Sequence, residues 1–419
     1  MKKIKFGIVG TGNRGYTFAR HIIAEGELYG LPEFQDMFSL VAMCDQNKIR
    51  LENVANSLKE KNIKIFTNYD QFLKESDCEI VIVTVSDFLH NEMCIKALLA
   101  GKNVLCEKPM TITVKDCQEI IQTAKKTKKQ FRMGFNMRYF PLNLKIKELL
   151  DSGIIGNIIS VQVNELMSAF HGADYFRRWH RNKEQSGGLL ITKVVHLFDL
   201  MSWFIQSTSE KIVCFGSKDF FKPKSYEQTR CLFCNQQKEC MFYFDLKHAK
   251  DGLLDKMFLQ AEKEDGYIRD KCVFSKESDI EDNYTIMVTY KNNVKISYFL
   301  NFFCAAPSID LSGNDRLMYF FVGDKGTLEV YSDEEDKEIA GIIEIREFLK
   351  GKTTLKIKSM KSSHGGGDVL LLKSFLNQEN NLEQLTNDDL NAGLQSVLVG
   401  NAANLSLAEN RIVYAKEFL

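Results

Sequence analysis

Three polar residues interrupt an apolar stretch near the middle of the chain. The segment Ser186–Trp203 reads SGGLLITKVVHLFDLMSW, and its apolar residues recur at helical spacing. Within it, Lys193, His196 and Asp199 follow one another at intervals of three residues. On one α-helix such residues lie on the same face, so their side chains can reach a common space. A histidine there suits general acid–base chemistry, and the alternative is a core histidine held by two hydrogen-bonding partners.

A glycine-rich turn follows the first apolar segment. The strand predicted at Lys3–Val9 leads into a G-x-G-x-x-G motif, and a helix is predicted over Tyr16–Glu25. Glycines in this pattern allow a tight turn and a close approach to the pyrophosphate of a dinucleotide, which would lie at the helix N-terminus. The candidate cofactor-binding residues are Gly10, Thr11, Gly12, Asn13, Arg14 and Gly15.

The second predicted strand, Ser39–Cys44, ends at Asp45. An acidic residue at this point can accept hydrogen bonds from the ribose hydroxyls of NAD and would repel the 2′-phosphate of NADP. Asp45 follows the glycine motif by more than the roughly 20 residues that are usual, and we attribute the excess to an insertion at Gly26–Phe38. The sequence therefore favours NAD over NADP as the cofactor.

Two alternatives to this role of Asp45 remain open. The carboxylate could instead cap a helix predicted over Gln46–Lys59. In addition, Lys48 and Arg50 lie just beyond it and make a smaller case for NADP.

Strands and helices alternate as far as Asn136. The apolar run Glu79–Val85 predicts a central parallel strand, and Asn103–Cys106 predicts another that ends in Glu107-Lys108-Pro109. The carboxyl ends of parallel strands meet at one edge of the sheet, where open α/β sheets bind ligands. The sequence thus predicts an N-terminal Rossmann domain.

Composition narrows the classes of function. A chain of 419 residues is long enough for two domains. Its 55 basic residues balance its 55 acidic ones, so there is no electrostatic case for binding nucleic acid or an anionic membrane. The 11 cysteines are scattered through apolar segments, as in reduced intracellular proteins. We expect no secretory signal, no membrane span and a cytoplasmic location.

Taken in order, these motifs resemble the Gfo/Idh/MocA family of NAD(P)-dependent sugar and polyol oxidoreductases. Glu-Lys-Pro followed by the Gly-Gly…His-x-x-Asp stretch is the specific part of the resemblance. The matching segments span nearly the whole chain and are Gly7–Gly15, Thr84–His90, Ala100–Met110, Met133–Pro141, Ser186–Trp203 and Val397–Val413.

The resemblance implies a Rossmann domain over residues 1–136. It also implies a C-terminal α/β domain over residues 137–419 that binds the substrate and contains a mostly antiparallel sheet, whose open face often forms a homodimer or homotetramer. Lys108 would lie beside the nicotinamide and touch the substrate hydroxyl, and His196 would be the general acid/base. Further implied cofactor contacts are Thr84, Val85, His90 and Glu107, and Asn136 is an implied substrate contact.

One position departs from the family pattern. The family usually places an aspartate four residues before the histidine, where this chain has Thr192. A hydroxyl cannot replace a carboxylate as a charged group that orients the substrate. Lys193 follows and is a candidate second cation at the site.

Two neighbouring stretches are candidates for the substrate pocket. Ala173–Arg181 reads ADYFRRWHR, and we expect Arg178, Trp179 and His180 to contact the substrate, because arginine binds anions and an indole stacks on sugar rings. The alternative is a solvated basic turn. We also expect the loop Ser362–Asp368 to border this pocket, with a helix cap at Asp368 as the alternative.

Three cysteines have the spacing of metal ligands. Cys231, Cys234 and Cys240 could bind a structural zinc ion with a fourth ligand from elsewhere in the chain. The candidates for this ligand are Cys272, His248 and Cys214. The alternative is three free thiols in a loop insertion.

The sequence as a whole predicts an NAD-dependent oxidoreductase that acts on a CH–OH group of a sugar, polyol or sugar derivative. A first alternative is a redox-neutral enzyme that keeps its NAD and cleaves or epimerises a glycoside. A second alternative is a non-catalytic dinucleotide-binding sensor, against which the intact Lys108 and His196 argue.

Overall fold

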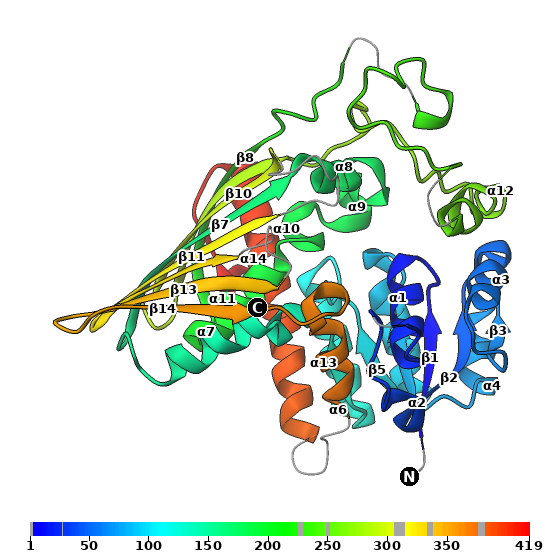
Figure 1. Cartoon of the computed structure of the whole chain (residues 1–419), viewed down its shortest axis with the longest axis horizontal. Helices are drawn as coiled ribbons and strands as arrows, with labels where there is room; N and C mark the ends of the chain where they lie inside the picture. Colours follow the sequence, from blue (N-terminus) through cyan, green and yellow to red (C-terminus); the bar gives the residue numbers. More distant parts are fainter. Residues whose placement is uncertain are drawn as a thin grey trace. The chain divides into compact units, whose positions relative to one another are not determined.

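The computed structural model divides the chain into two compact units (Figure 1). It describes residues 3–26, 28–224, 229–248, 252–305, 315–332, 338–375 and 382–419. The first unit comprises Met1–Phe135, Tyr226–Ser275 and Asp368–Leu394, and the second comprises Asn136–Ser225, Lys276–Gly367 and Gln395–Leu419. The first unit thus combines the N-terminal segment with two segments from later in the sequence.

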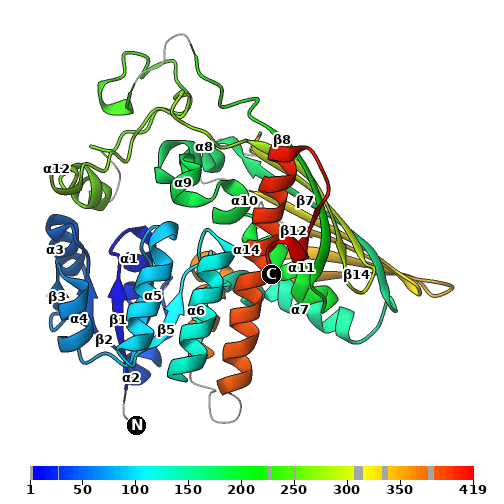
Figure 2. The ribbon, with the colours of Figure 1, turned by 180° about the vertical axis from the view of Figure 1, so that it is seen from behind.

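The first unit is built on a six-stranded parallel sheet with the order β3-β2-β1-β4-β5-β6. The strands are β1 Ile4–Val9, β2 Phe38–Cys44, β3 Lys64–Phe66, β4 Ile80–Val83, β5 Asn103–Cys106 and β6 Phe131–Met133. The helices are α1 Asn13–Ile22, α2 Phe34–Met37, α3 Lys48–Ser57, α4 Tyr69–Glu75, α5 His90–Leu99, α6 Val114–Thr127 and α13 Gly367–Lys373. Helices α5 and α6 cover one face of the sheet, and α1 and α13 cover the other (Figures 1 and 2). The predicted Rossmann fold is confirmed.

Because this sheet is buried on both faces, its central strands are continuous apolar runs in the sequence. All four residues of β4, which reads IVIV, are buried, as expected of a central strand between two layers of helices. Strands β1, β2, β4 and β5 end next to Gly10, Asp45, Thr84 and Glu107, respectively. These candidate residues therefore share the carboxyl edge of the sheet.

A segment with little regular structure packs on α3 within the first unit. It contains the short elements η4 Cys231–Phe233, η5 Asp255–Leu259 and α12 Glu262–Asp265. The Asn47 side chain donates to the carbonyl oxygen of Ala261 at 2.9 Å, and Arg50 forms an ion pair with Asp265 at 2.6 Å. Both contacts lie just beyond Asp45, so this segment borders the end of the nucleotide-binding edge.

The second unit is built on a nine-stranded sheet with the order β14-β13-β12-β11-β7-β10-β9-β8-β15. Its strands are β7 Ile158–Ser168, β8 Ser209–Ser217, β9 Asn283–Tyr290, β10 Lys295–Cys304, β11 Arg316–Gly323, β12 Gly326–Ser332, β13 Ile339–Glu347, β14 Gly351–Lys358 and β15 Val413–Tyr414. Only the pairing of β10 with β7 is parallel. The predicted mostly antiparallel sheet is confirmed.

Helices cover one face of this sheet (Figure 2). They include α7 Pro141–Asp151, α11 Val195–Ile205 and α14 Leu382–Glu409, the last of which begins in the first unit. Phe198 of α11 packs edge to face on Tyr298 of β10, with ring centroids 5.3 Å apart. Large apolar side chains on the opposite face are exposed and comprise Phe215, Met287, Phe299, Phe320 and Tyr331.

The sequence predicts no membrane span, but one stretch has the length and hydropathy of a span. Among the described residues, this stretch is Lys183–Ile205, whose most apolar window has a mean hydropathy of 1.5. That window is 83% buried inside the structure. Its hydropathy is therefore accounted for by core packing in the second unit.

Candidate active site

The glycine motif forms a cradle at the start of α1. Gly10 has a φ of +90°, and a Cβ atom there would lie 2.7 Å from the carbonyl carbon of Thr84. A Cβ at Gly15 would lie 2.0 Å from the carbonyl oxygen of Gly10, so both glycines are needed for close packing. By contrast, a Cβ at Gly12 would meet no heavy atom of the described residues within 4 Å. The open space over Gly12, at the N-terminus of α1, fits a pyrophosphate bound by backbone N–H groups.

The Thr84 hydroxyl holds this cradle against the next strand. It donates to the carbonyl oxygen of Gly10 at 2.7 Å and lies 3.0 Å from that of Val9. The Thr84 side chain is buried. Thr84 thus fixes the glycine turn, and Val85 continues the same edge.

Asp45 is held in place by hydrogen bonds to both of its carboxylate oxygens. One oxygen accepts from the backbone N–H of Thr11 at 2.8 Å and from its hydroxyl at 2.9 Å. The other accepts from the N–H of Asn47 at 2.9 Å, and Arg50 lies 3.5 Å away. Helix α3 is capped by Asn47, whose side chain accepts from the N–H of Arg50, so the helix cap considered for Asp45 is wrong.

Arg14 of the glycine motif connects three parts of the first unit. Its guanidinium forms a two-pronged ion pair with Asp368, with distances of 2.9 and 3.0 Å, and also binds Glu107. Burial alone would lower the pKa of Arg14, but the two carboxylates raise it, so the side chain is a fixed cation. The second oxygen of Glu107 accepts from the backbone N–H of Lys108 at 3.0 Å. Arg14 thereby anchors the loop that carries Lys108.

His90 holds the same loop from the other side. One ring nitrogen lies 2.7 Å from the carbonyl oxygen of Pro109, and the other lies 3.2 Å from that of Val85. Burial lowers the pKa of His90, but the neighbouring Cys106 sulfur, Asp87 carboxylate and Pro109 carbonyl outweigh it and raise the pKa to about 9. His90 therefore acts on this edge by positioning two loops.

Lys108 follows β5 at the carboxyl edge, and its peptide bond to Pro109 is cis. The side chain is partly exposed, whereas Glu107 and Pro109 on either side of it are buried. An ammonium group on a loop anchored in this way can stabilise negative charge on a substrate oxygen.

The stretch from Ser186 to Trp203 is not one helix. It consists of α9 Lys183–Ser186, α10 Leu189–Thr192 and α11, with a break at Lys193. Lys193 lies at the break between α10 and α11, whereas His196 and Asp199 both lie on α11, so the single helix predicted for the three residues is wrong. Asp199 forms a two-pronged ion pair with Arg138, with distances of 2.6 and 2.8 Å. Thr192 ends α10 and is buried, and His196 lies in the first turn of α11 and is 9% exposed.

Lys193 is paired with a carboxylate that the sequence analysis missed. Its ammonium nitrogen lies 3.1 Å from Glu165 of β7, and both side chains are largely buried. Burial alone would lower the pKa of Lys193, but Glu165 and Asp315 raise it. Asp315 in turn lies 2.7 Å from a ring nitrogen of His171. Lys193 is therefore a fixed cation.

A signal for Glu165 was present in the sequence. Residues Val161, Val163 and Met167 alternate on the buried face of β7, and Glu165 occupies the same face. A charged residue at a buried position in this alternation indicates a partner or a site. One oxygen of Glu165 is buried and has no hydrogen-bonding partner among the described residues.

Replacing Glu165 by glutamine is expected to destabilise the second unit by about 3 kcal/mol, because Lys193 would stay buried without its ion pair. Thermal unfolding followed by calorimetry measures the effect. The double variant Glu165→Gln/Lys193→Met removes both charges and should recover most of the stability. Equal stability of the single variant and the unmodified protein would show that the pair is dispensable.

The predicted substrate contacts form an aromatic and basic cluster on η3 Trp179–Arg181. The rings of Trp179 and His180 stack with centroids 3.7 Å apart, and Tyr175 of α8 Ala169–Arg177 meets His180 edge to face at 5.3 Å. A side-chain nitrogen of Arg178 lies 3.5 Å from His180. His180 is buried, whereas Arg178 and Trp179 are partly exposed, and Arg178 also lies 3.7 Å from the Asp174 carboxylate.

The remaining predicted site residues are placed as follows. Asn136 is buried at the start of η2 Asn136–Tyr139, in the second unit. Asp368 pairs with Arg14 in the first unit, which the sequence does not indicate. The predicted metal ligands Cys231, Cys234 and Cys240 lie in the first unit. Among the described residues, no three His, Cys, Asp or Glu side chains are already arranged to hold a metal ion.

Comparison with family models agrees with this fold. Residues 4–135 match the model for an oxidoreductase family with an NAD-binding Rossmann fold, and residues 147–415 match the C-terminal α/β domain of the same family.

Individual relatives point the same way. The putative oxidoreductase YteT of Bacillus subtilis is 30% identical over 83% of this chain and 84% of its own length. The 2,7-anhydro-N-acetylneuraminate hydratase of Mediterraneibacter gnavus is 27% identical over 57% of this chain and 59% of its own length. The fold also matches scyllo-inositol dehydrogenase from Lactobacillus casei, solved with NAD(H) and scyllo-inositol, with a TM-score of 0.68, 18% identity, and coverage of 99% of this chain and 100% of that chain. This chain therefore belongs to the Gfo/Idh/MocA oxidoreductase family.

Proposed function

We propose that the protein is an NAD-dependent dehydrogenase that oxidises a hydroxyl group of a polyol, sugar or sugar derivative. The observation that carries the proposal is the Lys108 loop, which Arg14 and His90 anchor at the carboxyl edge of a Rossmann sheet. The name of the scyllo-inositol dehydrogenase, which shares the fold, favours a polyol substrate.

In this proposal, His196 takes the hydroxyl proton of the substrate, and Lys108 stabilises the negative charge that develops on the oxygen. Lys193 cannot serve as the base in its present pairing, because Glu165 and Asp315 hold it as a cation. Glu165 acts in this proposal by holding Lys193 as a cation, because its second oxygen is itself buried.

The first unit supplies the groups that would hold NAD. Gly12 and the N-terminus of α1 fit the pyrophosphate, and Asp45 lies at the end of β2, where the ribose is expected. When bound, the nicotinamide would accept a hydride from the carbinol carbon of the substrate.

A screen of polyols, aldoses and glycosides for net NADH production tests the proposal. A dehydrogenase should form one NADH for each substrate molecule oxidised. Consumption of a substrate without any net NADH would contradict it and favour the redox-neutral alternative below.

The choice of NAD over NADP also remains a proposal. We expect NADH to bind more tightly than NADPH, because the Asp45 carboxylate would repel the 2′-phosphate. Replacing Asp45 by serine should narrow this difference. Fluorescence titration with both nucleotides measures this difference in affinity. Tighter binding of NADPH than of NADH by the unmodified protein would contradict the choice of NAD.

A redox-neutral reaction is the second candidate. Two observations favour it: Thr192 stands where the family usually has an aspartate, and one relative is named as a hydratase. Such an enzyme would oxidise a sugar carbon transiently, carry out elimination or epimerisation, and restore the original oxidation state. The NADH assay separates it from a dehydrogenase.

We also propose that the exposed apolar sheet face pairs with a second copy of the chain. Phe215, Met287 and Phe299 come from three adjacent strands and are each at least half exposed. Exposed apolar patches of this kind mark interaction surfaces. Light scattering should find a dimer or tetramer.

A cytoplasmic location stays a prediction.

A further inference from the structure

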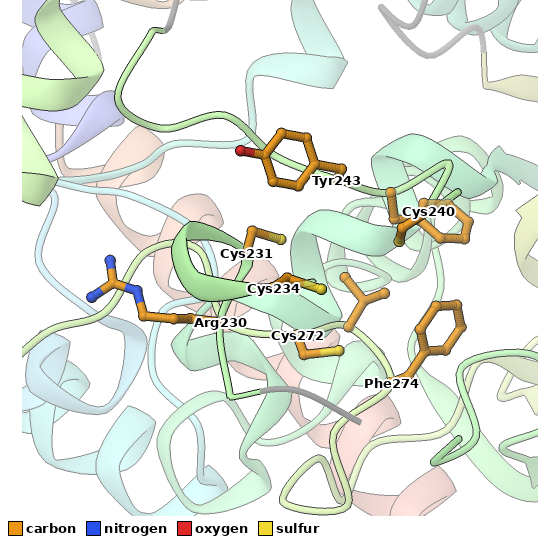
Figure 3. Close-up of a pocket in the computed structure, with 9 residues that line it drawn as sticks. Arg230, Cys231, Cys234, Cys240, Tyr243, Cys272 and Phe274 are labelled. Carbon is orange, nitrogen blue, oxygen red and sulfur yellow. The ribbon is translucent and has the colours of Figure 1, made fainter. Parts of the chain in front are cut away.

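Four cysteines line one pocket in the first unit. Cys231, Cys234 and Cys240 come from one stretch of chain, and Cys272 comes from another. In Figure 3 the sulfur atoms of Cys231, Cys234 and Cys272 point to the same side, toward the region where Cys240 lies. The remaining wall is largely apolar and includes Phe242, Val273 and Phe274.

Backbone pairing brings the two stretches together. Arg230 and Lys271 form an antiparallel bridge. On one side of it, the N–H of Cys231 donates to the carbonyl oxygen of Asp270 at 2.8 Å, and on the other, the N–H of Cys272 donates to that of Thr229 at 3.2 Å. The Arg230 side chain adds an ion pair to Asp270 at 2.6 Å. The meeting of Cys231 and Cys272 is thus built into the backbone.

The turn after Cys231 brings in the other two thiols. The N–H of Cys234 donates to the carbonyl oxygen of Cys231 at 3.0 Å, which closes a tight turn over the C-x-x-C motif. The N–H of Gln236 donates to the sulfur of Cys234 at 3.4 Å, which holds the turn closed after this cysteine. The N–H of Cys240 then donates to the carbonyl oxygen of Gln236 at 2.9 Å. This turn supplies three of the pocket's four sulfur atoms.

We propose that this pocket is a structural zinc site formed by four thiolates, those of Cys231, Cys234, Cys240 and Cys272. Zinc in structural sites prefers four tetrahedral ligands, and tetrathiolate sites commonly contain a C-x-x-C pair. Binding replaces four S–H bonds by four Zn–S bonds, releases four protons and changes no oxidation state. The described side chains are not already arranged around an ion, so coordination requires the four thiols to turn toward the pocket centre.

The geometry also selects the fourth ligand. His248 is exposed and lies 3.0 Å from Asp245, and Cys214 belongs to β8 in the second unit. Neither residue lines the pocket, whereas Cys272 does. Among the described residues, none of the four cysteines forms a disulfide.

The segment that contains the pocket has little regular secondary structure to stabilise it. Its elements η4, η5 and α12 are three to five residues long, and none of them forms a regular layer. A metal that links two distant stretches restricts the unfolded chain and stabilises such a segment. Because this segment contacts Asn47, which caps α3, and Arg50 on α3, zinc would stabilise the border of the carboxyl edge of the sheet.

Metal analysis of the full-length protein, purified under reducing conditions without chelator, tests the proposal. We expect about one zinc per chain and an X-ray absorption spectrum with four sulfur neighbours at about 2.3 Å. Cys272→Ser should lose most of the zinc and melt at a lower temperature. The matched control Cys304→Ser, which alters a cysteine outside the pocket, should keep both zinc content and melting temperature.

Three results would overturn the proposal. The first is protein that stays metal-free after incubation with zinc and reductant. The second is a bound metal with fewer than four sulfur neighbours, and the third is a disulfide among the four cysteines in the purified protein. If Cys272→Ser does not fold, cobalt substitution of the unmodified protein decides instead. Visible absorption typical of tetrahedral cobalt thiolate supports the site, and its absence contradicts it.

Discussion

Replacing His196 by alanine should lower the rate of substrate oxidation by a factor of about 10²–10⁴, the usual contribution of a general base. In the unmodified enzyme, the oxidation rate should rise with pH at acidic pH, because a general base accepts a proton only in its neutral form. In His196→Ala this rise should be absent. NAD should still bind, because the glycine cradle is unchanged. Steady-state kinetics across pH, with NAD titration, measure all three effects.

An exposed histidine of the first unit provides the control for this variant. His248 is exposed in the first unit, and His248→Ala should keep the full rate and the pH profile of the unmodified enzyme. If His196→Ala keeps nearly full activity and its rate still rises with pH at acidic pH, another group takes the proton.

Replacing Lys108 by alanine should cost a factor of about 10²–10³ in kcat, as for loss of one hydrogen-bond donor to a developing oxyanion. NAD binding should weaken less, since Arg14, Glu107 and Asp368 still hold the loop. Lys108→Arg keeps the positive charge and should retain more activity than Lys108→Ala. If both variants oxidise the substrate at the original rate, Lys108 does not touch the reacting oxygen.

The strand ends that carry the candidate nucleotide contacts could be predicted because their signals are local. The glycine motif, Asp45 and the Glu-Lys-Pro sequence each directly follow a strand whose apolar run is recognisable on its own. The parallel sheet then places the ends of these strands at one edge. No long-range pairing had to be known in advance.

The structural features that could not be predicted from the sequence depend on contacts between residues far apart in the chain. Arg14 and Asp368 are 354 positions apart, and no local pattern links them. Glu165 differs from its neighbours on β7 only by being charged at a buried position. The break at Lys193 is also tertiary in origin, because the apolar spacing on both sides is compatible with one continuous helix.

Transfer of deuterium tests the central claim most directly. The substrate found in the screen is labelled with deuterium at the carbon to be oxidised and incubated with the enzyme and NAD. The proposal predicts that mass spectrometry finds the deuterium in accumulating NADH, one label for each product molecule. A product that forms while NADH stays absent, with the deuterium returned to it or lost to water, would contradict a dehydrogenase.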